Sequence, residues 1–235
     1  MIFTDDVLTS IGKWQRGWRE QPDLKSQISA ELLEACQSIP PEFKTVDIPC
    51  YRKRFLIGDE LLDIVIRDEK NEGIASWTTD RRFAERFKDI IRPGTVSGAI
   101  FRHVPDPSEI ILNIPSLWKN RDFCLAVDEL NNKFPEQARP LLHFKDIQSE
   151  IILNTPLRGS AIIALSGVSS HFDVICDKFN IPACDRDHLF KIAIENGIPI
   201  QEPTYISEEG VQRVLENAVK RIKKIIDDEQ NKNCL

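Results

Sequence analysis

The order of its periodic segments is the feature that most limits how this chain of 235 residues can fold. A segment with helical spacing lies near the N-terminus, a cluster of strand-like segments follows, and helical segments end the chain. A doubly wound sheet would require strands and helices to alternate, and the chain has neither a GxGxxG nor a GxxxxGK(S/T) phosphate loop. The order therefore predicts an α+β fold, whose core is large enough to need no metal or disulfide support.

Periodicity also divides the chain into three parts. Pro22 suits a first helical turn and Ile28 and Leu32 recur at helical spacing, which predicts a helix over residues 22–36. Caps at Thr79 and Ser207 indicate further helices. Strands are expected at 45–55, 73–79, 95–104, 108–115, 149–155 and 160–168, and helices at 61–68, from Thr79 to Pro93-Gly94, at 116–136 and after Ser207. We expect a helical segment 1–44, a strand-rich core 45–169 and a helical C-terminal extension 170–235.

Composition excludes several classes of function. With 31 basic and 37 acidic residues the net charge is −6, which disfavours indiscriminate coating of nucleic acid or anionic lipid. The six cysteines form no CxxC pair, the N-terminus is acidic, and no apolar run approaches the roughly 20 residues that span a bilayer. The string formed by His171, Cys176, Cys184 and His188 has no usual zinc spacing. We therefore expect a cytoplasmic, reduced protein with no membrane role and no metal.

Three separated segments carry residues suited to chemistry. Arg52 lies in CYRKRF, Ser76 in ASWTTD, and Gln148 and Glu150 in DIQSEIIL, each at an expected strand or its edge. Side chains alternate between the faces of a strand, so Gln148 and Glu150, two residues apart, are expected to point into one cleft.

In this order, the three segments resemble the mono-ADP-ribosyltransferases of the Arg–Ser–Glu type. Members carry an aromatic-Arg pair, a Ser-x-Thr or Ser-x-Ser strand, and a Gln/Glu-x-Glu before a further strand. The closest stretches are SWTTDRRFAERF and QSEIILNTPLRG, and the resemblance runs from Tyr51 to about Val168. It implies that residues 45–169 form an ADP-ribosyltransferase-like core of two small packed sheets around an NAD cleft, with NAD+ as substrate.

The resemblance implies a role for each matching residue. Glu150 would stabilise the oxocarbenium-like centre that forms when the nicotinamide–ribose bond breaks, and would hydrogen-bond the ribose 2′-hydroxyl. Ser76 would orient Glu150, and Gln148 would face the incoming nucleophile. Residues expected to bind NAD+ are Arg52, Tyr51, Trp77, Thr78, Phe83 and Phe87, although helical spacing also fits Phe83 and Phe87 as core residues. Lys53 stands where members often have glycine, which leaves open whether Arg52 or Arg54 is the phosphate ligand.

The acceptor is predicted from Gln148 and from local charge. In the family a glutamine at this position accompanies acceptors other than arginine. The segment from Ile74 to Val104 contains six basic and three acidic residues. Its net charge of +3 is suited to contact with a phosphate backbone. We expect Arg81, Arg82 and Trp118 to contact the target, and the insertion 119–146 to form a recognition loop.

The resemblance favours a toxin or effector in phage defence, with RNA as the favoured target and an antitoxin or inhibitor protein as a partner. A protein acceptor, an NAD glycohydrolase and a non-catalytic binding module stay as alternatives.

Overall fold

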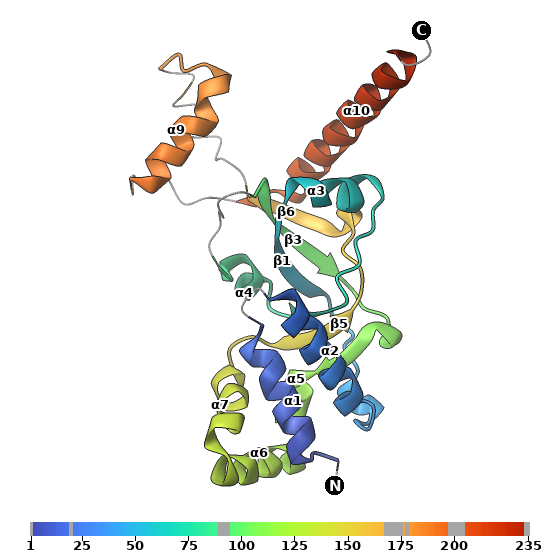
Figure 1. Cartoon of the computed structure of the whole chain (residues 1–235), viewed down its shortest axis with the longest axis vertical. Coiled ribbons are helices and arrows are strands. Elements are labelled where there is room, and N and C mark those ends of the chain that lie inside the picture. Colours follow the sequence, from blue (N-terminus) through green and yellow to red (C-terminus); the bar gives the residue numbers. More distant parts are fainter. Residues whose placement is uncertain are drawn as a thin grey trace. The chain divides into compact units, whose positions relative to one another are not determined.

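The computed structural model describes residues 2–18, 21–88, 95–166, 176, 179–196 and 205–232, and its elements are shown in Figure 1. Helices and antiparallel strands are both present, so the predicted α+β class is confirmed. The chain forms two compact units that interleave along the sequence. Unit 1 comprises Met1–Arg52, Asn71–Ala84 and Arg102–Pro156, and unit 2 comprises Lys53–Lys70, Glu85–Phe101 and Leu157–Leu235.

Unit 1 combines the N-terminal helices with a group of antiparallel strands hydrogen-bonded in the order β4-β5-β2-β1. Its strands are β1 (Cys50–Leu56, shared with unit 2), β2 (Ile74–Thr78), β4 (Ile110–Asn113) and β5 (Glu150–Asn154). Its helices are α1 (Asp5–Arg16), α2 (Pro22–Cys36), α5 (Ile114–Trp118), α6 (Arg121–Lys133) and α7 (Pro135–Phe144), with short 3₁₀ turns η1 (Pro41–Phe43) and η3 (Pro107–Glu109). α4 (Arg81–Arg86) follows β2.

The pairing of β2 with β5 fixes which side chains share a face. Ser76 lies opposite Ile152, and Thr78 lies opposite Glu150. Directly opposed residues of antiparallel strands point to the same side, and side chains two apart on one strand do so too. Ser76, Thr78, Glu150 and Ile152 therefore lie on one face of these two strands.

Residues 1–44 were expected to be helical, but only the helix over 22–36 was assigned; α1 lies before it, although its sequence signals are present. The Thr4 hydroxyl accepts a hydrogen bond from the Val7 amide, and Asp5 and Asp6 occupy the first turn. Its buried residues recur three or four apart, as an amphipathic helix requires; they are Val7, Leu8, Ile11, Gly12 and Trp14. The helix ends at Gly17, whose φ of 78° is a conformation that glycine, which has no Cβ, adopts more readily than other residues.

The core of unit 1 lies between these helices and one face of the strands. Phe123 of α6 is fully buried and meets Phe3 and Trp118 edge-on, with ring centroids 5.3 and 5.1 Å away. Ile152 of β5 belongs to the same cluster, as do the buried residues of α1 and α2. α1 packs against α2 and α7, and α6 against α7, as Figure 1 shows. The predicted insertion 119–146 is therefore largely helical and contributes to this core.

Unit 2 is built on strands in the order β1-β3-β6-β7. Its further elements are α3 (Gly58–Leu61), the π-helical turn η2 (Leu62–Ile66), β3 (Ser97–His103), η4 (Gly159–Ala161), β6 (Ile162–Ser166), α9 (Ala183–Glu195), β7 (Tyr205–Ile206) and α10 (Glu208–Lys232). Val211 of α10 is buried, and Ser207 accepts a hydrogen bond from the Gly210 amide, so the predicted cap is confirmed. Asp68 joins η2 to η4 by binding the amide and hydroxyl of Ser160.

Most element predictions agree with the structure within a few residues. The helix 22–36 has the predicted bounds, and each predicted strand overlaps an observed one. Thr79 was wrong as the cap of α4, because the Asp80 carboxylate accepts the hydrogen bonds from the Arg82 and Phe83 amides. The predicted helix end at Pro93-Gly94 and His171 of the cysteine–histidine string lie outside the described residues.

Neither a cluster of metal-ligating side chains nor a membrane-spanning helix is found in the described part of the chain. Among residues with a described placement, no group of three metal-ligating side chains lies together. Within the same residues, no helix is long and apolar enough to cross a membrane.

The packing of α6 predicts a large loss of stability on truncation of one apolar residue of this helix and a small change on truncation of another. Phe123→Ala removes a fully buried ring and is expected to lower the free energy of unfolding by about 3–5 kcal/mol. Leu125→Ala, at a position 49% exposed, is the matched control and should change it by less than about 0.5 kcal/mol. Urea denaturation followed by circular dichroism measures both, and equal losses would contradict the assigned core.

Candidate functional site

The register of β2 and β5 brings Ser76 to Glu150. The Ser76 hydroxyl donates a hydrogen bond of 2.5 Å to Oε1 of Glu150, which is the first residue of β5. Glu150 is only 3% exposed, so its carboxylate lies inside unit 1. The two residues that the sequence placed 74 positions apart are thus direct partners.

Helix α1 supplies two further donors to the same carboxylate. Nε1 of Trp14 lies 3.0 Å from Oε1 of Glu150 and 3.1 Å from the Ser76 hydroxyl oxygen. Nε2 of Gln15 donates to Oε2 of Glu150 at 3.2 Å. Sequence reasoning missed both residues, because it assigned no helix before residue 22 and because these contacts join opposite parts of the chain.

Burial and hydrogen bonding act in opposite directions on Glu150. Burial raises its pKa above the ordinary value of 4.5, because the charged form loses hydration. Hydrogen bonds from Ser76, Gln15 and Trp14 favour the charged form and offset part of this rise. All three donors are uncharged. The net result is a carboxyl group that holds its proton more strongly than an exposed glutamate.

Arg52 lies beside this pair. Its guanidinium donates to the main-chain oxygen of Ser76 at 2.7 Å and pairs with the Glu72 carboxylate at 3.1 Å. Glu72 is itself held by Lys25, whose ammonium group donates to its main-chain oxygen. Arg54, the alternative phosphate ligand, belongs to unit 2 and pairs with Glu60. Of the two arginines, Arg52 is therefore the one that contacts the strand carrying Ser76.

The turn before Glu150 differs from the sequence expectation. Glu150 begins β5, and Ser149 has a φ of +43°, so residues 148–150 are not an extended strand. The argument that Gln148 and Glu150 share a face by alternation is therefore wrong. The Gln148 main-chain oxygen accepts a hydrogen bond of 2.6 Å from Thr78, and its half-buried side chain bonds no other described residue. Thr78 thus braces the turn that leads into Glu150.

The other predicted cofactor residues are more dispersed. Tyr51 is half-buried and lies opposite Thr78 in the strand register. Trp77 alternates with Ser76 and so points to the opposite face of β2, where it is buried with its ring centroid 6.0 Å from that of His103. Phe83 of α4 is half-buried, whereas Phe87 is exposed and belongs to unit 2. Within unit 1, Tyr51 therefore shares the strand face of Thr78 and Glu150, whereas Trp77 points away from it.

The predicted target residues are also separated. Arg81 and Arg82 are exposed in the first turn of α4. Trp118 packs against the core cluster, where Phe123 meets its ring edge-on and Lys145 lies 4.8 Å from its centroid. Trp118 is thus held between the core and a cation of the insertion.

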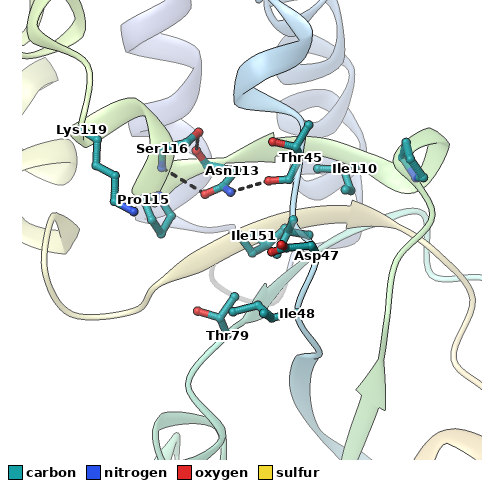
Figure 2. Close-up of a pocket in the computed structure, with 12 residues that line it drawn as sticks. Thr45, Asp47, Ile48, Thr79, Ile110, Asn113, Pro115, Ser116, Lys119 and Ile151 are labelled. Atoms are coloured by element: carbon teal, nitrogen blue, oxygen red, sulfur yellow. Dashed lines mark hydrogen bonds between the residues drawn. The ribbon is translucent and has the colours of Figure 1, made fainter.

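A cavity of about 470 Å³ lies elsewhere in unit 1. Its walls come from the segment before β1, from β4 and β5 and from α5, and Figure 2 shows Asn113 bound to Thr45 and Ser116 at one wall. Ile151 lines the cavity and follows Glu150, so it points to the opposite face of β5. The lining residues are Thr45, Val46, Asp47, Ile48, Thr79, Pro107, Ile110, Asn113, Pro115, Ser116, Lys119 and Ile151. None of the residues that hold the Glu150 carboxylate reaches this cavity.

The strongest chemical arrangement in unit 1 is therefore the buried Ser76–Glu150 pair with Arg52 beside it. Such a carboxylate can accept a substrate hydroxyl or stabilise a nearby positive charge, and a guanidinium can bind phosphate oxygens. No protein-family model, curated protein or solved structure matches this chain.

A second carboxylate of unit 1 offers a contrast. Glu109 accepts hydrogen bonds from the Thr155 hydroxyl at 2.6 Å and the Asp106 amide at 2.8 Å, and lies 2.6 Å from Nε2 of His103. Burial raises its pKa, but the hydrogen bonds from Thr155, His103 and Asp106 outweigh burial, so the pKa lies below 4.5. Glu109 thus favours its charged form, whereas Glu150 does not.

The two carboxylates predict opposite pH dependences of stability. The folded-state pKa of Glu150 lies above its ordinary 4.5, so wild type loses stability relative to Glu150→Gln as pH rises from 4.5 through that folded pKa. The contribution of ionised Glu109 is present above 4.5 and is lost as pH falls through its lowered folded pKa, so Glu109→Gln should approach wild type in acid. Urea denaturation from about pH 3 to pH 8 measures both differences. Parallel pH profiles for the two variants would contradict the assigned environments.

Proposed function

We propose that this chain is a mono-ADP-ribosyltransferase that transfers ADP-ribose from NAD+ to a macromolecule. The observation that carries the proposal is the direct hydrogen bond from Ser76 to Glu150, with Arg52 on the main-chain oxygen of the same serine. These three residue types occur in the order of the Arg–Ser–Glu transferases, and their contacts agree with the role of a serine that orients the glutamate. The finer fold that the resemblance implies, two small packed sheets around an NAD cleft, is part of this proposal.

The reaction requires a carboxylate near the ribose. The bond between nicotinamide and C1′ breaks, and its electron pair leaves with nicotinamide. The acceptor atom then forms a bond to C1′ and releases a proton. Ionised Glu150 stabilises the positive charge that develops on the ribose, while Arg52 binds the pyrophosphate in exchange for its pairing with Glu72. No metal is needed for this route.

An RNA base is the acceptor that we favour. Gln148 can donate and accept hydrogen bonds but cannot deprotonate a nucleophile, which suits acceptors other than arginine. Arg81 and Arg82 are exposed on α4, which follows directly after β2, and can contact a phosphate backbone. A protein side chain is the alternative acceptor. We further propose a cytoplasmic toxin or effector in phage defence, restrained by an antitoxin or inhibitor protein.

Two other functions have specific support. The left-handed Ser149 removes the strand alternation that would direct Gln148 to an acceptor, which favours an NAD glycohydrolase that passes the ribosyl cation to water. The 3% exposure of Glu150 favours a non-catalytic binding module in which this carboxylate only joins α1 to the sheet. The labelled-NAD+ incubation and the Glu150→Gln variant described below separate both from transfer.

Incubation with NAD+ labelled in its adenylate part and total bacterial lysate identifies the acceptor. Transfer leaves label on macromolecules, and ribonuclease should release it whereas protease should not. Release of label by protease alone would show that the acceptor is a protein. Free labelled ADP-ribose without labelled macromolecules would identify a glycohydrolase.

Glu150→Gln is expected to reduce nicotinamide release by at least about 100-fold, because the neutral amide stabilises a developing positive charge far less than a carboxylate does. Glu109→Gln is the matched control, since it makes the same change at a half-buried carboxylate outside the site, and it should retain activity at a temperature where both variants are folded. Chromatographic assay of nicotinamide measures both. Full activity in the Glu150 variant would remove the proposed mechanism.

Gln148→Ala is expected to separate transfer from hydrolysis. Its side chain bonds no other described residue, so truncation should leave the fold and slow nicotinamide release intact while label on the acceptor falls by about 10-fold or more. The ratio of bound label to free nicotinamide measures this effect. Equal loss of both products would contradict an acceptor-facing role for Gln148.

A further inference from the structure

The two oxygens of the Glu150 carboxylate are held in different ways. Oε1 accepts from the Ser76 hydroxyl at 2.5 Å and from Nε1 of Trp14 at 3.0 Å. Within the described residues, Oε2 accepts one hydrogen bond, from Nε2 of Gln15 at 3.2 Å. One oxygen is therefore fixed by two short contacts and the other by one longer contact.

Trp14 cannot leave this position without disrupting unit 1. The residue is 2% exposed and stacks obliquely on Trp18 at a centroid distance of 5.5 Å. The helix that carries it also buries Leu8 and Ile11 completely, and withdrawal would return these apolar side chains to water. Helix α1 is thus a permanent wall of the site rather than a lid.

Gln15 is placed differently. Its side chain is half-buried, and its Oε1 atom is buried without a hydrogen-bond partner in the described part of the chain. An unpaired buried acceptor makes the present orientation less favourable. Rotation of this side chain needs no movement of α1, and it would open Oε2 of Glu150.

We propose that Trp14 is a positioning residue that fixes Oε1 of Glu150, and that Gln15 occupies the place of the substrate hydroxyl that binds Oε2. This inference rests on the proposed function, in which the hydroxyl belongs to the ribose of NAD+. A hydroxyl donor then replaces the Gln15 amide, and the carboxylate keeps its orientation because Ser76 and Trp14 hold the other oxygen. The burial of Glu150 is in this way compatible with substrate contact.

Trp14→Phe tests the positioning role, because phenylalanine retains an aromatic ring but lacks the indole N–H. The kcat of nicotinamide release should fall by about 10- to 100-fold with KM for NAD+ nearly unchanged. The acid limb of the pH–rate profile should move to higher pH, because the charged carboxylate loses a donor. Trp18→Phe makes the same change at the neighbouring ring and should alter neither. An unchanged kcat and profile in the Trp14 variant would overturn the role.

If Trp14→Phe does not fold, a closer substitute for tryptophan tests the same role. Replacing Trp14 by benzothienylalanine keeps the bicyclic shape and substitutes sulfur for the N–H. The same loss of kcat is expected from this protein, and full activity would overturn the positioning role.

Gln15→Ala tests the displaceable contact. Removal of an internal competitor should lower KM for NAD+ by about 3- to 10-fold and leave kcat within about 2-fold of wild type. A fall in kcat comparable to that of Trp14→Phe would show that Gln15 positions the carboxylate and would overturn its assignment as a placeholder.

Failure of this inference is distinguishable from failure of the proposed function. Absence of nicotinamide release from wild type with lysate present would remove the transferase and glycohydrolase proposals. The Glu150 carboxyl can still be titrated by carbon-13 NMR in wild type and Trp14→Phe. A higher pKa in the variant supports the hold of Trp14 on Oε1, and an identical pKa overturns it whatever the activity.

Discussion

The hydrogen bonding of one carboxylate that is excluded from water determines how the candidate site of unit 1 is built. Glu150 loses its hydration at the start of β5, and an ionised carboxylate in that position is tolerated only when donors surround it. Those donors come from two elements far apart in the sequence: Ser76 from β2, and Trp14 and Gln15 from α1. The β2–β5 register and the packing of α1 must therefore both be correct before the carboxylate is satisfied.

Local signals predicted the elements that carry the site, and the ordered resemblance predicted one of its contacts. The helix 22–36 and the strands around Ser76 and Glu150 follow from periodicity, which depends on neighbouring residues only. The Ser76–Glu150 pair joins positions 74 apart, and no spacing rule gives such a contact. It was anticipated because the order of the residue types resembles that of the Arg–Ser–Glu transferases, in which serine orients glutamate.

The parts that sequence reasoning missed depend on single backbone angles or on tertiary packing. Alternation of Gln148 with Glu150 assumed an extended backbone, but Ser149 adopts a left-handed conformation that the sequence does not signal. Helix α1 carries readable signals in Thr4 and its acidic first turn, yet nothing local indicates that Trp14 reaches a residue 136 positions away. Such a contact is decided by how α1 packs against the other helices of unit 1.

The contrast between Glu150 and Glu109 supports a functional interpretation of the site. Glu109 has enough donors for its pKa to fall, and so its charge contributes to stability. Glu150 has a raised pKa despite three donors, and an apolar residue of similar size would avoid that penalty. Groups whose ionisation opposes folding occur preferentially where chemistry requires them. Oε2 accepts a single contact of 3.2 Å from a partly unsatisfied Gln15, so it is held less firmly than Oε1. Under the proposed function, this less firmly held oxygen is the one that accepts the substrate hydroxyl, while Ser76 and Trp14 keep the other in place.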